Sequence, residues 1–393
     1  MRTKRVLVCA PRMPEYDREG GSRRVFHLIE MLRASGWSVT FLARYATQSE
    51  RYMRKLRQMG VIVYAGEESA LMGDEYLLRL DEVVTAGKFD LAILAFWEIA
   101  ERYVSIIRTS APQTRIIIDS IDLHFLRHAR KAVRRFPNSP VTGLLDTTYA
   151  DEMIRELNIY AQADAVLTVS EKEATLLADF LGDALPIIPV PLLEDVTSAA
   201  LTASERQGIV FLANFRHPPN IEAFGFLCEQ ILPAVDAHVF VQHPVYVVGN
   251  DAHTVAHMIG KGQRSFVQVV GWVPLVEPYL QRSRVSVVPV LHGAGTKTKL
   301  IQALTVGTPS VSTTIGAEGL DLRDGEDVLI ADTPVAFAAA IAQLLIDDAL
   351  WVRIATQGRE RIGRTHSREA VRTQFFATLA TVMRETRGSA LHS

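Results

Sequence analysis

A glycine-rich turn with two lysines follows an apolar run late in the chain. Residues 293–299 read GAGTKTK and come directly after the predicted strand 285–290. Small residues expose their backbone N–H groups, and the helix predicted to begin next adds the positive end of its dipole. Lys297 and Lys299 supply further positive charge. The segment predicts a phosphate site, with an ordinary βα connection and solvated lysines as the alternative; a Walker motif cannot be aligned here.

A carboxylate follows the next predicted strand. Residues 310–313 read as a buried strand, and residues 315–320 read IGAEGL, so that Glu318 is flanked by Gly316 and Gly319. Open α/β sheets bind ligands at the carboxyl ends of their strands. Glu318 is therefore a candidate acceptor of hydrogen bonds from ligand hydroxyls.

Polar groups also follow two strand-like runs in the first half of the chain. After the first run, Gly20 and Gly21 permit the backbone to approach a ligand closely, although no G-x-G-x-x-G dinucleotide fingerprint is present. The run 115–119 ends in Asp119, and Asp122 and His124 follow it. His124 is predicted either to bind or deprotonate a hydroxyl or to be a satisfied structural histidine, and no fourth ligand stands out for a metal.

An arginine occupies the same kind of position at the start of the second half. Arg216 follows the predicted strand 208–212, and Asn220 is predicted to cap the next helix. Arg216 is expected to reach the same phosphate as Lys299, or else to be a surface-loop arginine.

Alternating strands and helices must position these residues. Apolar strand-length runs alternate with helix-length segments in both halves, including a helix predicted over about 220–235, which indicates an α/β fold with doubly wound parallel sheets. A chain of 393 residues is long enough for two domains. We place them at residues 1–200 and 201–369, with a C-terminal helix over about 370–393 packing back on the first domain.

Composition narrows the classes of partner. Apolar residues make up 48%, charged residues 22%, and the net charge is −2, so nothing indicates a nucleic-acid partner. Cys9 and Cys228 are far apart and form no CxxC pair, which fits a reducing cytosol. The apolar run 6–10 is too short for a signal peptide or a membrane span. A basic run over 127–135 is interpreted as a solvated helix face, with contact to anionic lipid at a membrane surface or to a phosphorylated acceptor as the alternative.

Taken together, these segments resemble the family 4 retaining glycosyltransferases. The resemblance covers almost the whole chain and rests on PxxDxxGGxRR, DLHFLR, ADAVLTVSEKE, PPN after a strand, and GAGTKTKL with GTPSVSTTIGAEGL. It implies two Rossmann-like domains facing a central cleft, the GT-B fold, and a sugar nucleotide held mainly by the second domain. It implies catalytic roles for Arg216, Lys299 and His124; donor binding by Gly20, Gly21, Asn214, Gly295, Thr296, Lys297, Gln302, Gly316, Glu318 and Gly319; and an acceptor side with Arg23, Asp119 and Asp122.

The chain departs from the family pattern at the usual pair of glutamates separated by seven residues. Ala294 and Gln302 stand at those positions, so Gln302 is expected to bind ribose hydroxyls only through neutral hydrogen bonds. The reaction implied is transfer with retention from a nucleotide-diphosphate sugar to a hydroxyl acceptor, in polysaccharide or glycoconjugate biosynthesis, without a metal or other cofactor. A sugar-nucleotide epimerase-like enzyme of the same fold and a non-catalytic nucleotide-sugar-binding protein are the alternatives. The expected location is the cytoplasm, with a lipid-linked acceptor and the inner membrane face kept open.

Overall fold

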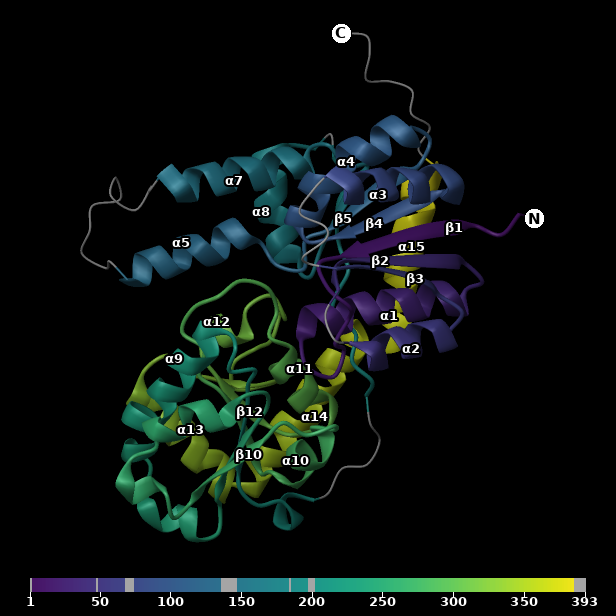
Figure 1. Cartoon of the computed structure of the whole chain (residues 1–393). Helices are drawn as coiled ribbons and strands as arrows, with labels where there is room; N and C mark the ends of the chain where they lie inside the picture. The colour runs from purple at the N-terminus through teal and green to yellow at the C-terminus, as the bar shows by residue number, and fades with distance from the viewer. Residues whose placement is uncertain are drawn as a thin grey trace. The chain divides into compact units, whose positions relative to one another are not determined.

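The computed structural model describes residues 2–46, 49–67, 74–135, 147–183, 185–196 and 202–384 (Figure 1). The chain divides into two compact units, each described by itself below. The first unit comprises residues 1–129, 136–191 and 371–393, and the second comprises residues 130–135 and 192–370.

The first unit is built on a parallel sheet. In the described residues its strand order is β3-β2-β1-β4-β5-β6-β7, and every strand pairs in parallel with its neighbours. The strands are β1 (Arg5–Ala10), β2 (Ser38–Ala46), β3 (Ile62–Glu67), β4 (Leu91–Ala95), β5 (Arg115–Asp119), β6 (Ala165–Thr168) and β7 (Ile187–Pro189). All five residues of β4 are buried, as expected for a central strand covered on both faces.

Helices cover both faces of this sheet. In Figure 1, α1 and α2 lie on one side of the strands, and α3 and α4 lie on the other. The helices of the first unit are α1 (Gly20–Ala34), α2 (Glu50–Gln58), α3 (Asp74–Gly87), α4 (Trp97–Ser110), α5 (His124–Arg135, whose last six residues group with the second unit), α7 (Thr147–Tyr160), α8 (Glu171–Leu181) and α15 (Arg368–Arg384, grouped with this unit from Val371).

The second unit has a similar parallel sheet. Its strand order in the described residues is β10-β9-β8-β11-β12-β13. The strands are β8 (Ile209–Leu212), β9 (Val245–Val248), β10 (Val267–Gly271), β11 (Val285–Val288), β12 (Ser310–Ser312) and β13 (Leu329–Ile330). From β8 the chain builds the sheet first in one direction, through β9 and β10, and then in the other, through β11, β12 and β13. The loops after β8 and β11 therefore lie side by side at the carboxyl ends of neighbouring strands, where such sheets bind ligands.

The helices of the second unit include several short turns. Its α-helices are α9 (Pro218–Phe226), α10 (Glu277–Arg282), α11 (Thr298–Thr305), α12 (Thr314–Ala317), α13 (Pro334–Ile346) and α14 (Asp348–His366). The remaining turns are η1 (Ala203–Glu205), the π-helical η2 (Leu227–Ile231), η3 (Leu232–Ala234), η4 (Ala237–Val241), η5 (Ala252–Met258) and η6 (Lys261–Gln263).

The α/β prediction with parallel sheets is confirmed, but the helix predicted over 220–235 is wrong at both ends. The α-helix begins at Pro218, with His217 at the N-cap, so Asn220 is inside the helix and does not cap it. Proline suits this first turn because it has no N–H to leave unbonded. The helix gives way to π and 3-10 turns after Phe226, before Pro233, whose ring cannot continue an α-helix.

The unit boundary and the C-terminus also differ in detail from the sequence prediction. The boundary follows Pro191, whereas the predicted boundary near residue 200 falls in residues 197–201, outside the described residues. Residues 371–384 group with the first unit, and the rest of the predicted C-terminal helix, 385–393, is also outside them. Among the described helices, none is by itself long and apolar enough to cross a membrane; by length and composition only the pair Pro334–Ile346 and Asp348–Arg384, bent by 102°, meets that test jointly.

Candidate active site

The glycine-rich turn forms the entrance to helix α11. Gly293 and Gly295 have φ angles of 140° and 66°, which a side chain would strain, so glycine is required for this path. Lys297 occupies the N-cap of α11, and no side chain caps the helix there. The Leu300 N–H donates to the Lys297 carbonyl at 2.9 Å, and no side chain in the described part of the chain accepts from the N–H groups before it. A helix N-terminus of this kind favours an anion.

Lys299 in the first turn of α11 is held by an amide. Its Nζ donates to Asn220 Oδ1 at 2.7 Å, and it lies 5.5 Å from the centre of the Phe211 ring. Asn220 in turn donates from Nδ2 to the carbonyl of Asn214, also at 2.7 Å. Burial, and then the charge of Lys297, lower the pKa of Lys299 to about 7. The ammonium therefore lies in a site where an incoming anion would favour its charged form strongly.

The neighbouring residues of the turn behave differently. Lys297 folds back on its own turn, since its Nζ donates to the carbonyls of Ala294 at 3.3 Å and Gly295 at 2.5 Å. Thr296 is 9% exposed, and its Oγ1 is buried without a hydrogen-bond partner among the described residues. A buried hydroxyl in that state costs free energy unless a ligand or water pairs with it. The turn thus offers a ligand both a cation and a hydroxyl.

Arg216 has a carboxylate partner. Its Nε donates to Asp251 Oδ2 at 2.8 Å, and its backbone N–H donates to Asn214 Oδ1 at 3.2 Å. The guanidinium is 49% exposed. Arg216 follows β8 and Asp251 follows β9, so the predicted position of Arg216 at a strand end is correct. The exposed carboxylate of Asp251 offsets part of the positive charge of Arg216.

Glu318 and Gln302 are two further residues of the second unit that the sequence predicts to bind the sugar nucleotide. Glu318 accepts hydrogen bonds from Arg130 Nη1 and Nη2 at 2.5 and 2.7 Å, so its carboxylate is charge-paired within this unit. Gly319 follows with a φ of 76°. Gln302 lies partly buried on α11, and its backbone carbonyl accepts a hydrogen bond from the Thr305 hydroxyl.

Gly316 is required by packing. A Cβ there would lie 2.3 Å from Ser312 Oγ and 2.7 Å from the Val288 carbonyl oxygen. Gly316→Ala is expected to destabilise the second unit by about 1–3 kcal/mol because the backbone of α12 must shift. Chemical denaturation measures this, and Gly262→Ala, where a Cβ meets no atom within 4 Å, is the control. Equal stability of the two variants would contradict the packing role.

In the first unit, His124 is the centre of a charged cluster. Trp97 Nε1 donates to His124 Nδ1 at 2.9 Å, Glu98 Oε1 lies 3.1 Å from the same nitrogen, and Asp122 Oδ1 lies 3.4 Å from Nε2. Burial lowers the pKa of His124, but the hydrogen bonds to Asp122 and Glu98 outweigh it and raise the pKa to about 9. The structure therefore brings two predicted residues together and adds Glu98.

Asp119 has a structural environment. It is fully buried and accepts both of its hydrogen bonds from Arg24 Nε, at 2.9 and 2.8 Å. Arg24 also donates from Nη1 to the carbonyls of Val190 at 2.6 Å and Pro191 at 3.3 Å. The hydrogen-bonding capacity of the Asp119 carboxylate is thus used by this arginine. The geometry of Asp119 does not indicate a role in binding the acceptor substrate.

The other predicted residues of the first unit lie on α1. Gly20 and Gly21 are its first two residues, and a Cβ on Gly21 would lie 3.1 Å from Ile121 and 3.2 Å from Phe96. Arg23 lies partly buried in the same first turn, and its backbone N–H donates to the Glu19 carbonyl. No side chain caps α1, so its N-terminus is a second place where backbone N–H groups face outward from a helix.

The sequence interpretation missed Arg24, Glu98 and Glu156, and it named Asn220 only as a helix cap and not as the partner of Lys299. Glu156 on α7 accepts the backbone N–H groups of His124 and Phe125, at 3.0 and 2.8 Å, and so holds the start of α5. The RR pair in the first loop motif and the glutamate after Trp97 were visible signals for two of these residues. No group of three or more metal-ligating side chains occurs in the part of the chain that the structure describes.

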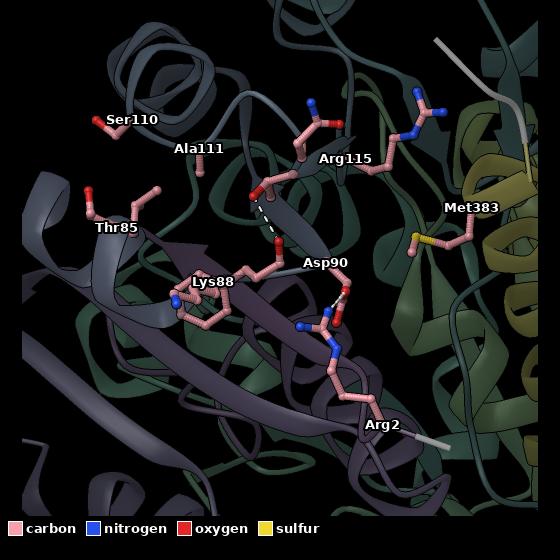
Figure 2. A pocket seen from close by; sticks show the side chains of 12 residues that line it. Arg2, Thr85, Lys88, Asp90, Ser110, Ala111, Arg115 and Met383 are labelled. Atoms are coloured by element: carbon pink, nitrogen blue, oxygen red, sulfur yellow. Dashed lines mark hydrogen bonds and ion pairs between the residues drawn. The ribbon is translucent and has the colours of Figure 1, made fainter.

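A separate recess of about 460 Å³ lies at the opposite, amino ends of the strands of the first unit. Figure 2 shows Arg2 turned toward Asp90, with Lys88, Arg115 and Met383 around them. Arg2 pairs with Asp90, and Arg115 pairs with Asp164 at 3.1 Å. Much of the positive charge here is therefore matched, and the recess has no part in the candidate active site.

Each of the two units is an α/β unit with a parallel sheet, and in the second unit a glycine-rich, cationic turn precedes a helix without a side-chain cap. This architecture is suited to binding a phosphorylated co-substrate. Residues 206–347 match the family model described as glycosyl transferases group 1, and residues 19–192 match the model described as glycosyl transferase 4-like domain. The chain belongs to the group 1 glycosyltransferases and is a glycosyltransferase by family.

A curated relative and several solved structures are similar to the chain. The lipopolysaccharide core biosynthesis glycosyltransferase LpsE of Rhizobium meliloti is 32% identical over 133 residues, which are 33% of this chain and 38% of that protein. Sucrose-phosphate synthase from Thermosynechococcus elongatus superposes with a TM-score of 0.72 at 18% identity, covering 97% of this chain and 99% of that one. TarM of S. aureus, in a complex with Fondaparinux, alpha-GlcNAc-glycerol and UDP, gives a TM-score of 0.73 at 11% identity, covering 98% and 100%. These structures confirm the GT-B fold class.

Proposed function

We propose that this protein transfers a sugar from a nucleotide-diphosphate sugar to a hydroxyl acceptor, with retention of the anomeric configuration and without a metal ion. The observation that carries the proposal is the turn before α11, where the ammonium of Lys299, the uncapped helix and the buried hydroxyl of Thr296 occur together. The similarity to HepE of Anabaena, solved in complex with UDP-glucose, supports it at the level of the fold, with a TM-score of 0.69 at 13% identity and coverage of 96% and 99%.

Departure of the nucleotide is the difficult step of such a reaction. As the anomeric bond breaks, negative charge grows on the diphosphate and the sugar becomes oxocarbenium-like. In the proposal, Lys299 and the N–H groups of α11 bind the diphosphate and stabilise this charge. Arg216 contributes when it exchanges its pair with Asp251 for the phosphate. The acceptor hydroxyl then attacks from the face that the nucleotide leaves, which gives retention.

The remaining predicted groups have supporting roles in the proposal. Gln302 and Glu318 bind hydroxyls of the donor, and Gly20 and Gly21 let the start of α1 approach it. The proposal assigns His124 to contact with the reacting sugar. The partial similarity to LpsE favours an acceptor used in lipopolysaccharide or another polysaccharide. A lipid-linked acceptor and work at the cytoplasmic membrane face remain predictions.

The proposal is tested first by donor binding and then by the product. A thermal-shift screen with uridine, guanosine and thymidine diphosphate sugars is expected to give one clear hit, since a ligand at about 100 times its Kd stabilises by about 2.7 kcal/mol. Transfer from that donor to a panel of acceptors, with EDTA present, is then followed by proton NMR of the anomeric signal. An inverted product contradicts retention, and loss of activity in EDTA contradicts metal independence. Binding without transfer would favour the sugar-nucleotide-binding protein.

Donor binding is expected to be coupled to proton uptake by Lys299. Because the pKa of Lys299 in the free protein is about 7, much of this lysine is neutral above that pH, whereas a bound diphosphate favours the ammonium. Donor affinity should therefore fall as the pH rises above about 7, by up to about tenfold per pH unit. Calorimetry at about pH 8 in two buffers of different ionisation enthalpy measures the proton uptake. Lys299→Met is the control, and identical enthalpies in both buffers with the wild type would exclude this coupling.

A further inference from the structure

The Nδ1 atom of His124 has two neighbours with opposite demands. Trp97 Nε1–H, at 2.9 Å, requires a lone pair on Nδ1, whereas the carboxylate of Glu98, at 3.1 Å, requires a proton there. Only one of these bonds forms at a time. The geometry therefore supplies a partner for the neutral imidazole and another for the imidazolium, and the surrounding charges decide between them.

Groups on three elements and one loop surround this imidazole. Glu98 comes from α4 and Asp122 from the loop before α5, with Arg127 and His128 on α5 itself. From α7, Glu156 binds the backbone at His124, and Glu152 pairs with His128 at 2.6 Å.

The balance of these groups favours a positive imidazole. The N-terminus of α5, where His124 lies, and Arg127 both oppose a second proton on the ring. Arg127, however, is bonded to Asp122 at 2.8 Å, and Glu98 and Asp122 face the two ring nitrogens directly. Glu98 gains from the same contact, because His124 keeps the pKa of Glu98 below its usual value although burial opposes this.

We propose that Glu98 is a positioning residue that keeps His124 doubly protonated, so that its imidazolium stabilises negative charge on the substrate and does not act as a base. The inference rests on the proposed function for the place of His124 beside the sugar. In a retaining transfer this assigns His124 to binding or charge stabilisation, and it leaves the acceptor proton to another group, such as the departing diphosphate.

The direct test is the protonation of His124 in solution. Its imidazole signals, assigned by their loss in His124→Gln, are followed by NMR from about pH 5 to about pH 10. The wild-type protein is expected to titrate near 9. Glu98→Gln keeps the side-chain size but removes the charge, and should lower the His124 pKa by at least about one unit. Glu98 is 43% exposed, so the variant is expected to fold.

Glu101→Gln is the matched control. Glu101 lies one turn further along α4 and pairs with Arg155 at 2.7 and 2.6 Å, so the same charge is removed without touching His124. The His124 pKa should stay unchanged in this variant. A wild-type pKa below about 7, or equal pKa values in wild type and Glu98→Gln, would overturn the proposal.

A pH profile of sugar transfer gives the functional readout. Activity of Glu98→Gln should fall at a lower pH than that of the wild type and the Glu101→Gln control, because the imidazolium is lost earlier. A profile of Glu98→Gln that instead rises through the His124 pKa would mean that the neutral histidine is a base, and would overturn the inference. The NMR titration needs no substrate, so a protein without transferase activity contradicts the proposed function and leaves the test of Glu98 intact.

Discussion

Lys299→Ala is expected to lower kcat by roughly 10²-fold or more, comparable to the loss of one oxyanion-hole donor. In the proposed mechanism the ammonium stabilises charge that appears on the diphosphate only as the nucleotide departs. Lys299 lies in the first turn of α11, and its Nζ donates to Asn220 Oδ1 at 2.7 Å. Its side chain is therefore already positioned before the donor binds. Steady-state kinetics with saturating donor and acceptor measure the effect.

Lys297→Ala is the matched control for this experiment. The two lysines are two residues apart, but Lys297 donates to carbonyls of its own turn at 3.3 and 2.5 Å. Its loss should act mainly on KM for the donor, by raising it, and less on kcat. Activity of Lys299→Ala within a few-fold of wild type would remove Lys299 from the leaving-group site. A larger loss for Lys297→Ala would exchange the roles of the two residues.

The phosphate turn could be predicted because its signal is local. A buried strand, small residues, lysines and an amphipathic helix follow one another within residues 285–305, and each carries its own conformational preference. The partner of Lys299 could not be found in this way. Asn220 is 79 residues earlier in the chain, and only the pairing of β8 with β11 brings the two segments together.

The strand-end argument predicted position better than role. Asp119 ends β5 and His124 begins the next helix, as expected, yet Asp119 is buried against Arg24. Arg23 and Arg24 are adjacent on α1, and consecutive residues of a helix face different directions, so the motif could not tell which one points inward. The charge state of His124 also depends on Glu98, which reaches it only through the packing of α4 beside β5.

Arg24→Ala is expected to destabilise the first unit by about 3–5 kcal/mol, because Asp119 would keep a buried charge without its partner. Arg24 is 3% exposed and Asp119 is fully buried, so water cannot replace the lost hydrogen bonds without a structural change. For a unit of this size the corresponding decrease in Tm is on the order of 10 °C. Differential scanning calorimetry measures the decrease, and Arg368→Ala, which breaks an exposed pair with Asp195, is the control with a change below about 1 kcal/mol.

The double variant Arg24→Met with Asp119→Leu separates the ion pair from the site it occupies. If the penalty of Arg24→Ala comes from the stranded carboxylate, replacing both partners with apolar side chains should recover most of the stability. The bonds of Arg24 to the carbonyls of Val190 and Pro191 are also lost in the double variant. These carbonyls end the first unit before its connection to residue 192, so a deficit remaining in the double variant measures the anchoring of this connection. No deficit in Arg24→Ala itself would show that the pair contributes nothing to the fold.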